Sequence, residues 1–164
     1  MDDQINVYVH TSGVHSFNQE IAGSYIVEYI KDGIPYTYPP EGKSTMLYAE
    51  KATPERVTIN LLTRAVAVIR QYLDKAKDIK SVTVYLDLIA SRAFINGWPK
   101  RWEAEGYMSA RHIEVKNREA WERYNEYMHK LDDVNICFTT LADSYQALMV
   151  RQADEELKRR QAAK

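Results

Sequence analysis

Asp87 is the first residue whose place in the sequence indicates chemistry. It follows residues 81–86, whose β-branched and aromatic side chains predict a buried strand that would deliver a carboxylate at its carboxyl end. The plain alternative is that Asp87 caps the helix predicted after it. His10 and His15 stand close together across a turn, but their spacing is not specific for a metal, and structural histidines are the simpler explanation. None of these residues defines a site by itself.

A second candidate is a segment that mixes aromatic and basic residues. Its members are Trp98, Lys100, Arg101, Trp102, Tyr107 and Arg111. Aromatic rings stack on bases and cations follow the phosphate backbone, so the segment could bind a nucleic-acid strand. The alternative is core packing, because residues four apart share one helix face, and Glu103 and Glu105 dilute the positive charge.

Composition predicts one ordinary globular domain. The chain has 164 residues, 45% hydrophobic and 27% charged, with a net charge of −1, so we expect a single domain over residues 1–164. No leader pattern opens the sequence and no apolar run approaches the roughly 18 residues of a membrane span. We therefore expect a cytoplasmic protein without a membrane partner. Cys137 is the one cysteine, and in its apolar run we expect a small buried residue.

Period-two alternation predicts strands. Residues 5–9 alternate apolar and polar side chains, and residues 21–30 are extended up to a Lys-Asp-Gly turn. The third strand lies either at residues 34–38 or at 45–50, and the pattern leaves both open. The last strand is predicted at 134–139.

Helical periodicity dominates between and after these strands. Thr53 followed by a proline and an acid is typical of a helix start, and the apolar spacing becomes firm from residue 61. Further helices are predicted at 89–97, at 118–131 with Asn117 as the cap, and at 143–160. This order of elements predicts an α/β domain with helices packed on a mixed sheet.

Several short patterns occur in the order found in a known family. They are Val-Tyr-Val-His-Thr-Ser at 7–12, Val-Thr-Val-Tyr-Leu-Asp at 82–87, Phe-Ile-Asn-Gly-Trp at 94–98, Glu-Gly-Tyr at 105–107, Val-Lys-Asn-Arg-Glu-Ala-Trp at 115–121 and Gln-Ala-Asp-Glu-Glu-Leu at 152–157. With this order and spacing the chain resembles type 1 ribonuclease H along nearly its whole length. The resemblance implies an α/β, ribonuclease H-like fold with a five-stranded mixed sheet and helices packed on both faces.

The resemblance places the family's acidic metal-binding positions on His10, Thr63, Asp87 and Asp154, with Leu62 as the alternative to Thr63. Only Asp87 and Asp154 are acids. That family holds two Mg²⁺ ions on carboxylates, so that one ion activates water and both steady the displacement at phosphorus. Imidazole prefers softer metals. We therefore expect a degenerate metal site.

Other family positions are altered as well. The loop that carries a catalytic histidine in the family corresponds to residues 140–145, which contain no histidine. The resemblance assigns nucleic-acid contacts to Asn60, Trp98, Lys100, Arg101, Trp102 and Asn117. The tyrosines between Tyr25 and Tyr48 could form a partner or dimer surface, or they could cover one face of the sheet.

Two functions therefore stay open. In the first, the chain is a ribonuclease H-like module without catalysis and without a cofactor, and it binds an RNA–DNA hybrid, another nucleic acid or a protein partner. In the second, it is an endonuclease that cleaves the RNA strand of such hybrids with Mg²⁺ or Mn²⁺. An altered site would then hold Mn²⁺ or Zn²⁺ on His10, Asp87 and Asp154. Candidates for its fourth ligand are Glu50, Glu55 and Asp143.

Overall fold

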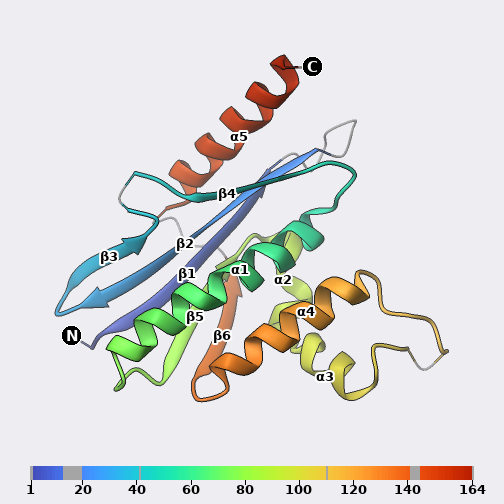
Figure 1. Ribbon diagram of the computed structural model, residues 1–164, viewed down its shortest axis with the longest axis horizontal. Coiled ribbons are helices and arrows are strands. Elements are labelled where there is room, and N and C mark those ends of the chain that lie inside the picture. The colour runs from blue at the N-terminus through green and yellow to red at the C-terminus, as the bar shows by residue number, and fades with distance from the viewer. Residues whose placement is uncertain (1, 13–19, 41, 110, 141–144, 164) are drawn as a thin grey trace.

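The computed structural model describes residues 2–12, 20–40, 42–109, 111–140 and 145–163, and Figure 1 shows the arrangement of its elements. The strands are β1 (Gln4–Ser12), β2 (Ile21–Lys31), β3 (Ile34–Tyr38), β4 (Thr45–Ala49), β5 (Ser81–Leu86) and β6 (Asn135–Thr140). The helices are α1 (Pro54–Lys75), α2 (Leu88–Ile95), α3 (Trp98–Ala104), α4 (Arg118–Met128) and α5 (Gln146–Ala162), with the 3₁₀ turn η1 (His129–Leu131) after α4. Across these ranges none of the helices combines the length and the apolar character that crossing a membrane requires.

A six-stranded mixed sheet forms the centre of the fold, in the order β3–β2–β1–β5–β6, with β4 also paired to β2. Strands β1, β5 and β6 are parallel, and β2 is antiparallel to its partners. Residues 21–25 of β2 pair with β4, and residues 27–31 pair with β3. Both candidate third strands are therefore strands, and the sheet exceeds the five expected strands. Prolines at 39 and 40 explain the break, because proline has no N–H for the ladder.

The two long helices that face the core begin in different ways. Thr53 accepts a hydrogen bond from the Arg56 N–H at 3.2 Å, as the sequence predicts for the start of α1. Asn117 stands at the predicted cap position of α4, but it has a φ of 63° and its side chain makes no capping bond. Its amide instead contacts Glu55 and Arg56, each at 3.4 Å. Asn117 therefore joins the starts of α1 and α4.

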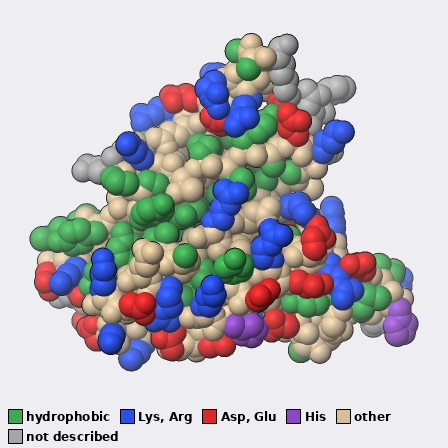
Figure 2. All heavy atoms as spheres, in the orientation of Figure 1, with side chains coloured by type: hydrophobic (Ala, Val, Ile, Leu, Met, Phe, Trp, Pro, Cys, Tyr) green, Lys and Arg blue, Asp and Glu red, His purple; other side chains and the backbone are tan. Residues whose placement is uncertain are grey.

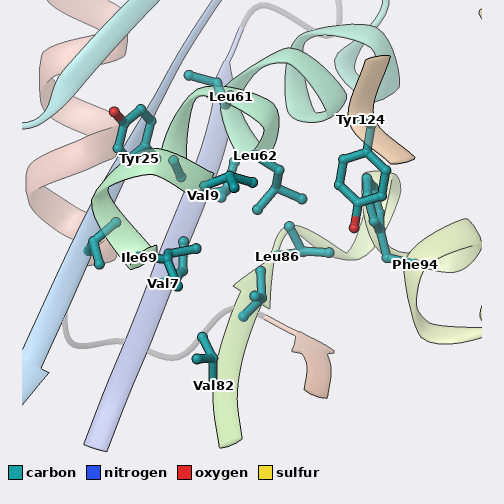
Figure 3. Close-up of a cluster of buried hydrophobic side chains, with 14 of the residues drawn as sticks. Val7, Val9, Tyr25, Leu61, Leu62, Ile69, Val82, Leu86, Phe94 and Tyr124 are labelled. Carbon is teal, nitrogen blue, oxygen red and sulfur yellow. The ribbon is translucent and has the colours of Figure 1, made fainter. Parts of the chain in front are cut away.

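The main core lies between one face of the sheet and the helices α1, α2 and α4. Strand alternation directs the odd-numbered residues of β1 and the even-numbered residues of β5 into this core. Figure 3 shows Leu61, Leu62 and Ile69 of α1 lying over these strands, with Phe94 and Tyr124 alongside. The burial of this apolar surface stabilises the domain.

Helix α5 covers the opposite face of the sheet. Tyr8 of β1 and Ile26 of β2 pack against Met149, and Ala153 and Leu157 continue the contact along the helix. Helices therefore lie on both faces of the sheet, as the resemblance implied.

Cys137 is exposed, so the expectation of a buried cysteine is wrong. It lies on β6, the edge strand, and its Sγ is 3.8 Å from the hydroxyl of Ser81. Its neighbours Ile136 and Phe138 pack against the core. Cys137 therefore points to the other face of the sheet, because side chains alternate along a strand.

Candidate site at the carboxyl ends of β1 and β5

Strands β1 and β5 are parallel neighbours, so their carboxyl ends meet at the same edge of the sheet. Tyr8 is opposite Tyr85, and their rings stack with centroids 4.9 Å apart and planes inclined by 7°. His10 and Asp87 follow two positions further along, on the same face. The parallel ladder thus joins an imidazole and a carboxylate that are 77 residues apart in the sequence.

The carboxylate of Asp87 is held by two donors from β1. Its Oδ1 is 3.0 Å from His10 Nδ1, and its Oδ2 accepts the Thr11 backbone N–H at 2.8 Å. The other ring nitrogen, His10 Nε2, is 3.0 Å from the hydroxyl of Ser12. Both carboxylate oxygens and both ring nitrogens therefore have hydrogen-bond partners inside the protein.

This contact is largely withdrawn from water. The side chains of His10 and Asp87 are 11% and 15% exposed, so the carboxylate depends on its protein donors rather than on solvent. Asp87 occupies the N-cap position of α2, but its side chain makes no capping bond. Asp87 therefore stands where the cap interpretation places it, but its carboxylate is turned toward β1 rather than toward the start of α2.

The other predicted metal ligands are not gathered with this pair. Asp154 is exposed on α5, and Glu50 and Glu55 accept hydrogen bonds from a tyrosine and an asparagine. Over the part of the chain that the structure describes, no three His, Cys, Asp or Glu side chains form a group that could hold a metal ion. Asp143 and His15 lie outside the described residues.

Thr63 contacts its own helix rather than the β1–β5 site. Its hydroxyl donates to the Ile59 carbonyl at 2.8 Å, and the residue is buried. Thr63 and Asn60 line a hollow of about 430 Å³ between α1, α4 and β4, together with Arg64 and Arg123. Neither arginine makes an ion pair with another described residue. The hollow therefore has two guanidinium groups beside polar groups.

Glu28 is a buried acid that sequence reasoning missed. Its carboxylate accepts hydrogen bonds from Asn6 at 3.0 Å, from Tyr8 at 3.3 Å, and from the hydroxyl of Tyr145. This network ties β1 and β2 to the start of α5 on the same sheet face as His10. An acid inside an apolar strand pattern was the available signal, since a buried carboxylate requires partners.

The aromatic and basic segment is partly packed into the fold. Trp98 and Trp102 pack against the core, and the ring of Trp102 is 5.3 Å from that of the buried Trp121. The guanidinium groups of Arg92 and Arg101 lie 5.3 Å and 6.0 Å from the centre of the Trp98 ring. These two cations flank one partly exposed aromatic ring, and Lys100 is exposed on the same helix, α3.

Tyr107 does not belong to this exposed group. It is buried, and its hydroxyl accepts a hydrogen bond from Asn125 at 3.0 Å.

Charges of both signs are mixed over the face of the molecule drawn in Figure 2, so positive charge is not concentrated in one patch there. Any nucleic-acid contact would depend on local groups rather than on overall charge.

No family model and no curated protein matches this sequence. Solved structures do. The ribonuclease H domain of prototype foamy virus matches with 12% identity and a TM-score of 0.58, over 93% of this chain and 92% of that one. LC9-RNase H1, described as a type 1 RNase H with the type 2 active-site motif, matches with 14% identity and a TM-score of 0.59, over 93% and 72% of the two chains.

A longer neighbour is the foamy viral protease-reverse transcriptase, solved in complex with an RNA/DNA hybrid. It matches with 14% identity and a TM-score of 0.58 over 92% of this chain, which spans 19% of that protein's length. Together these neighbours show that the chain has a ribonuclease H-like fold, as the sequence patterns implied.

Proposed function

We propose that this chain is a ribonuclease H-like module that binds RNA–DNA hybrids and does not cleave them by two-metal chemistry. The observation that carries the proposal is the contact between His10 and Asp87. This contact lies at the family positions where metal ligands are expected, and the carboxylate of Asp87 accepts its hydrogen bonds from protein groups.

The donor set at the β1–β5 end does not fit a pair of Mg²⁺ ions. Such a pair needs several free carboxylate oxygens close together. Here Asp87 is the one acid of the pair, both its oxygens accept hydrogen bonds from β1, and the imidazole of His10 is a poor ligand for Mg²⁺. The arrangement supports a module that has kept the fold without the metal chemistry.

Two groups of side chains support nucleic-acid binding. The first is Trp98 with Arg92 and Arg101, because a ring flanked by guanidinium groups can stack on a base while the cations contact phosphates. The second is the hollow lined by Arg64 and Arg123, neither of which makes an ion pair within the part of the chain that the structure describes. A foamy viral relative of this fold was solved with an RNA/DNA hybrid, so the hybrid is the ligand that we propose.

The test combines binding and cleavage in the same samples. A labelled RNA–DNA hybrid is titrated at several salt concentrations in the presence of Mg²⁺ or Mn²⁺. We expect salt-dependent binding without cleavage, and the double change Lys100→Ala and Arg101→Ala should weaken binding and lower the salt slope by about 1 for each lost phosphate contact. Arg151→Ala is the matched control, because Arg151 is an exposed cation on α5.

Two results would overturn this proposal. Cleavage by the wild type that disappears in Asp87→Asn would establish the alternative, an active nuclease with an altered metal site. Absence of any salt-dependent binding to hybrid, duplex or single strands would favour a protein partner instead.

A protein partner is the second candidate function. Ile34, Tyr36 and Tyr38 are exposed on β3, which ends the sheet on that side, and aromatic residues are enriched at interfaces. If this surface joins two copies, light scattering at rising concentration will show a dimer that Tyr36→Lys abolishes. A monomer at all concentrations would reject the dimer.

A further inference from the structure

A chain of hydrogen bonds at the carboxyl end of β1 links a hydroxyl, an imidazole and a carboxylate. The Ser12 hydroxyl is 3.0 Å from His10 Nε2, and His10 Nδ1 is 3.0 Å from Asp87 Oδ1. The second carboxylate oxygen accepts the Thr11 N–H at 2.8 Å. A serine, a histidine and an aspartate connected in this order form the arrangement that activates a nucleophile in serine hydrolases, which is recognised by geometry rather than by sequence position.

The hydrogen bonds also determine where the imidazole proton lies. A carboxylate accepts only, so Asp87 requires the proton of the neutral ring on Nδ1. The lone pair on Nε2 then faces the Ser12 hydroxyl, which donates to it. Because Thr11 holds Asp87 from the backbone, Asp87 acts as a positioning residue for the ring. His10 is thus oriented to take the hydroxyl proton.

We propose that Ser12 is a nucleophile that reacts with neutral carboxylic esters carrying a short apolar acyl group. Its oxygen bonds to the carbonyl carbon as its proton passes to His10 Nε2. The bond from that carbon to the alkoxy oxygen then breaks, and the alcohol leaves with the proton from His10. Water hydrolyses the resulting acyl-serine by the same proton transfers, so the reaction needs no metal and no redox partner.

The charges and the apolar surroundings indicate this substrate class. No Lys or Arg of the described residues forms an ion pair or hydrogen bond with Ser12, His10 or Asp87. A phosphodiester carries a negative charge and would therefore be repelled by the Asp87 carboxylate, with no cation to compensate. A neutral ester carries no charge and would not be repelled. Leu88 and Ile89 follow Asp87 directly in the sequence and are 79% and 63% exposed, so apolar side chains are available near the carboxylate for an acyl group.

Ser12 is accessible enough for such a reaction. It is partly exposed at the end of β1, while His10 and Asp87 behind it are nearly buried. A base shielded from water and a nucleophile at the surface suit attack on a bound ester. This activity is separate from hybrid binding, because it uses no contact of Trp98, Arg64 or Arg123.

The experiment measures covalent labelling of the full chain by a fluorophosphonate and release of nitrophenol from p-nitrophenyl butyrate, without nucleic acid. We expect an adduct on Ser12 by peptide mass mapping, no adduct in Ser12→Ala, and a rate at least about 100-fold lower in His10→Gln. Ser24→Ala is the matched control, because this buried serine stands opposite His10 in the sheet and its hydroxyl has no partner among the described residues.

Circular dichroism establishes that each variant is folded, and Asp87→Asn serves as a second test of the orienting contact if His10→Gln unfolds. Asparagine in place of Asp87 can offer its amide N–H to the ring and favour the wrong tautomer, so labelling should fall by about 100-fold or more. The absence of a Ser12 adduct in the wild type, or equal labelling rates in wild type and the folded variants of His10 and Asp87, would overturn the proposal. The outcome of the hybrid-binding experiment does not depend on whether Ser12 is labelled, so the two proposals are tested separately.

Discussion

Replacing Asp87 with asparagine tests the contact between His10 and Asp87, because the direction in which the free energy of unfolding changes depends on what holds the carboxylate. In a cluster of acids built for metal ions, the carboxylates repel one another when the metal is absent, so removing one charge stabilises the metal-free protein. In this chain Asp87 accepts hydrogen bonds from His10 and Thr11 instead. Removing its charge should therefore destabilise the fold.

The expected size follows from these two hydrogen bonds. A bond to a charged group contributes about 1.5–3 kcal/mol, and a bond between neutral groups contributes about 0.5–1.5 kcal/mol. Asparagine keeps an oxygen for the Thr11 N–H, and the ring of His10 can change its tautomer, so each bond weakens rather than disappears. We expect a loss of about 2 kcal/mol, which corresponds to a fall in Tm of about 4–8 °C for a domain of this size.

The assay is urea and thermal unfolding followed by circular dichroism, at neutral pH with a chelator present. Asp154→Asn is the matched control, since Asp154 is an exposed acid, and its change should stay within about 0.5 kcal/mol. If Asp87→Asn is as stable as the wild type or more stable, the carboxylate is not held by its protein donors and our account of the site is refuted.

Three further predictions concern contacts elsewhere in the fold. Gly23→Ala places a methyl group 2.9 Å from Leu61 Cδ1, and this overpacking should lower the free energy of unfolding by about 1–3 kcal/mol. Urea unfolding measures the change, and an unchanged midpoint would contradict the close approach of α1 and β2. Thr53→Ala removes the cap of α1 and should lower stability by about 1 kcal/mol in the same assay. The Glu103 carboxylate hydrogen-bonds His129 and raises the pKa of that imidazole above its ordinary value of 6.5, so this contact stabilises the fold below pH 6.5 and the stabilisation is lost as the pH rises through the raised pKa. An NMR titration should show the pKa of His129 falling in Glu103→Gln.

Local patterns predicted most of the elements. The alternation in β1 and the capping signal at Thr53 depend on residues a few positions apart, and both are confirmed by the structure. The choice between residues 34–38 and 45–50 could not be made in this way. Both segments form strands because β2 is long enough to pair with each, and that pairing is a contact across the sheet.

Burial was harder to predict than secondary structure. Cys137 has the apolar neighbours of a core residue, yet it is exposed because β6 is the last strand of the sheet. For Tyr107 the sequence left nucleic-acid binding and core packing both open, and the structure buries it against Asn125. The sequence pattern records which residues are apolar, but the neighbouring elements decide which of them are covered.

The sequence by itself determined the class of fold, the places of Asp87 and His10 at the ends of two strands, and the loss of acids from positions where the resemblance implies metal ligands. Only the tertiary structure decided that Asp87 turns toward β1, that His10 lies between it and Ser12, and that Asp154 stays exposed. Periodicity is a property of neighbours along the chain. A hydrogen bond across 77 residues depends on the register of β1 against β5, which the packing of the whole sheet sets.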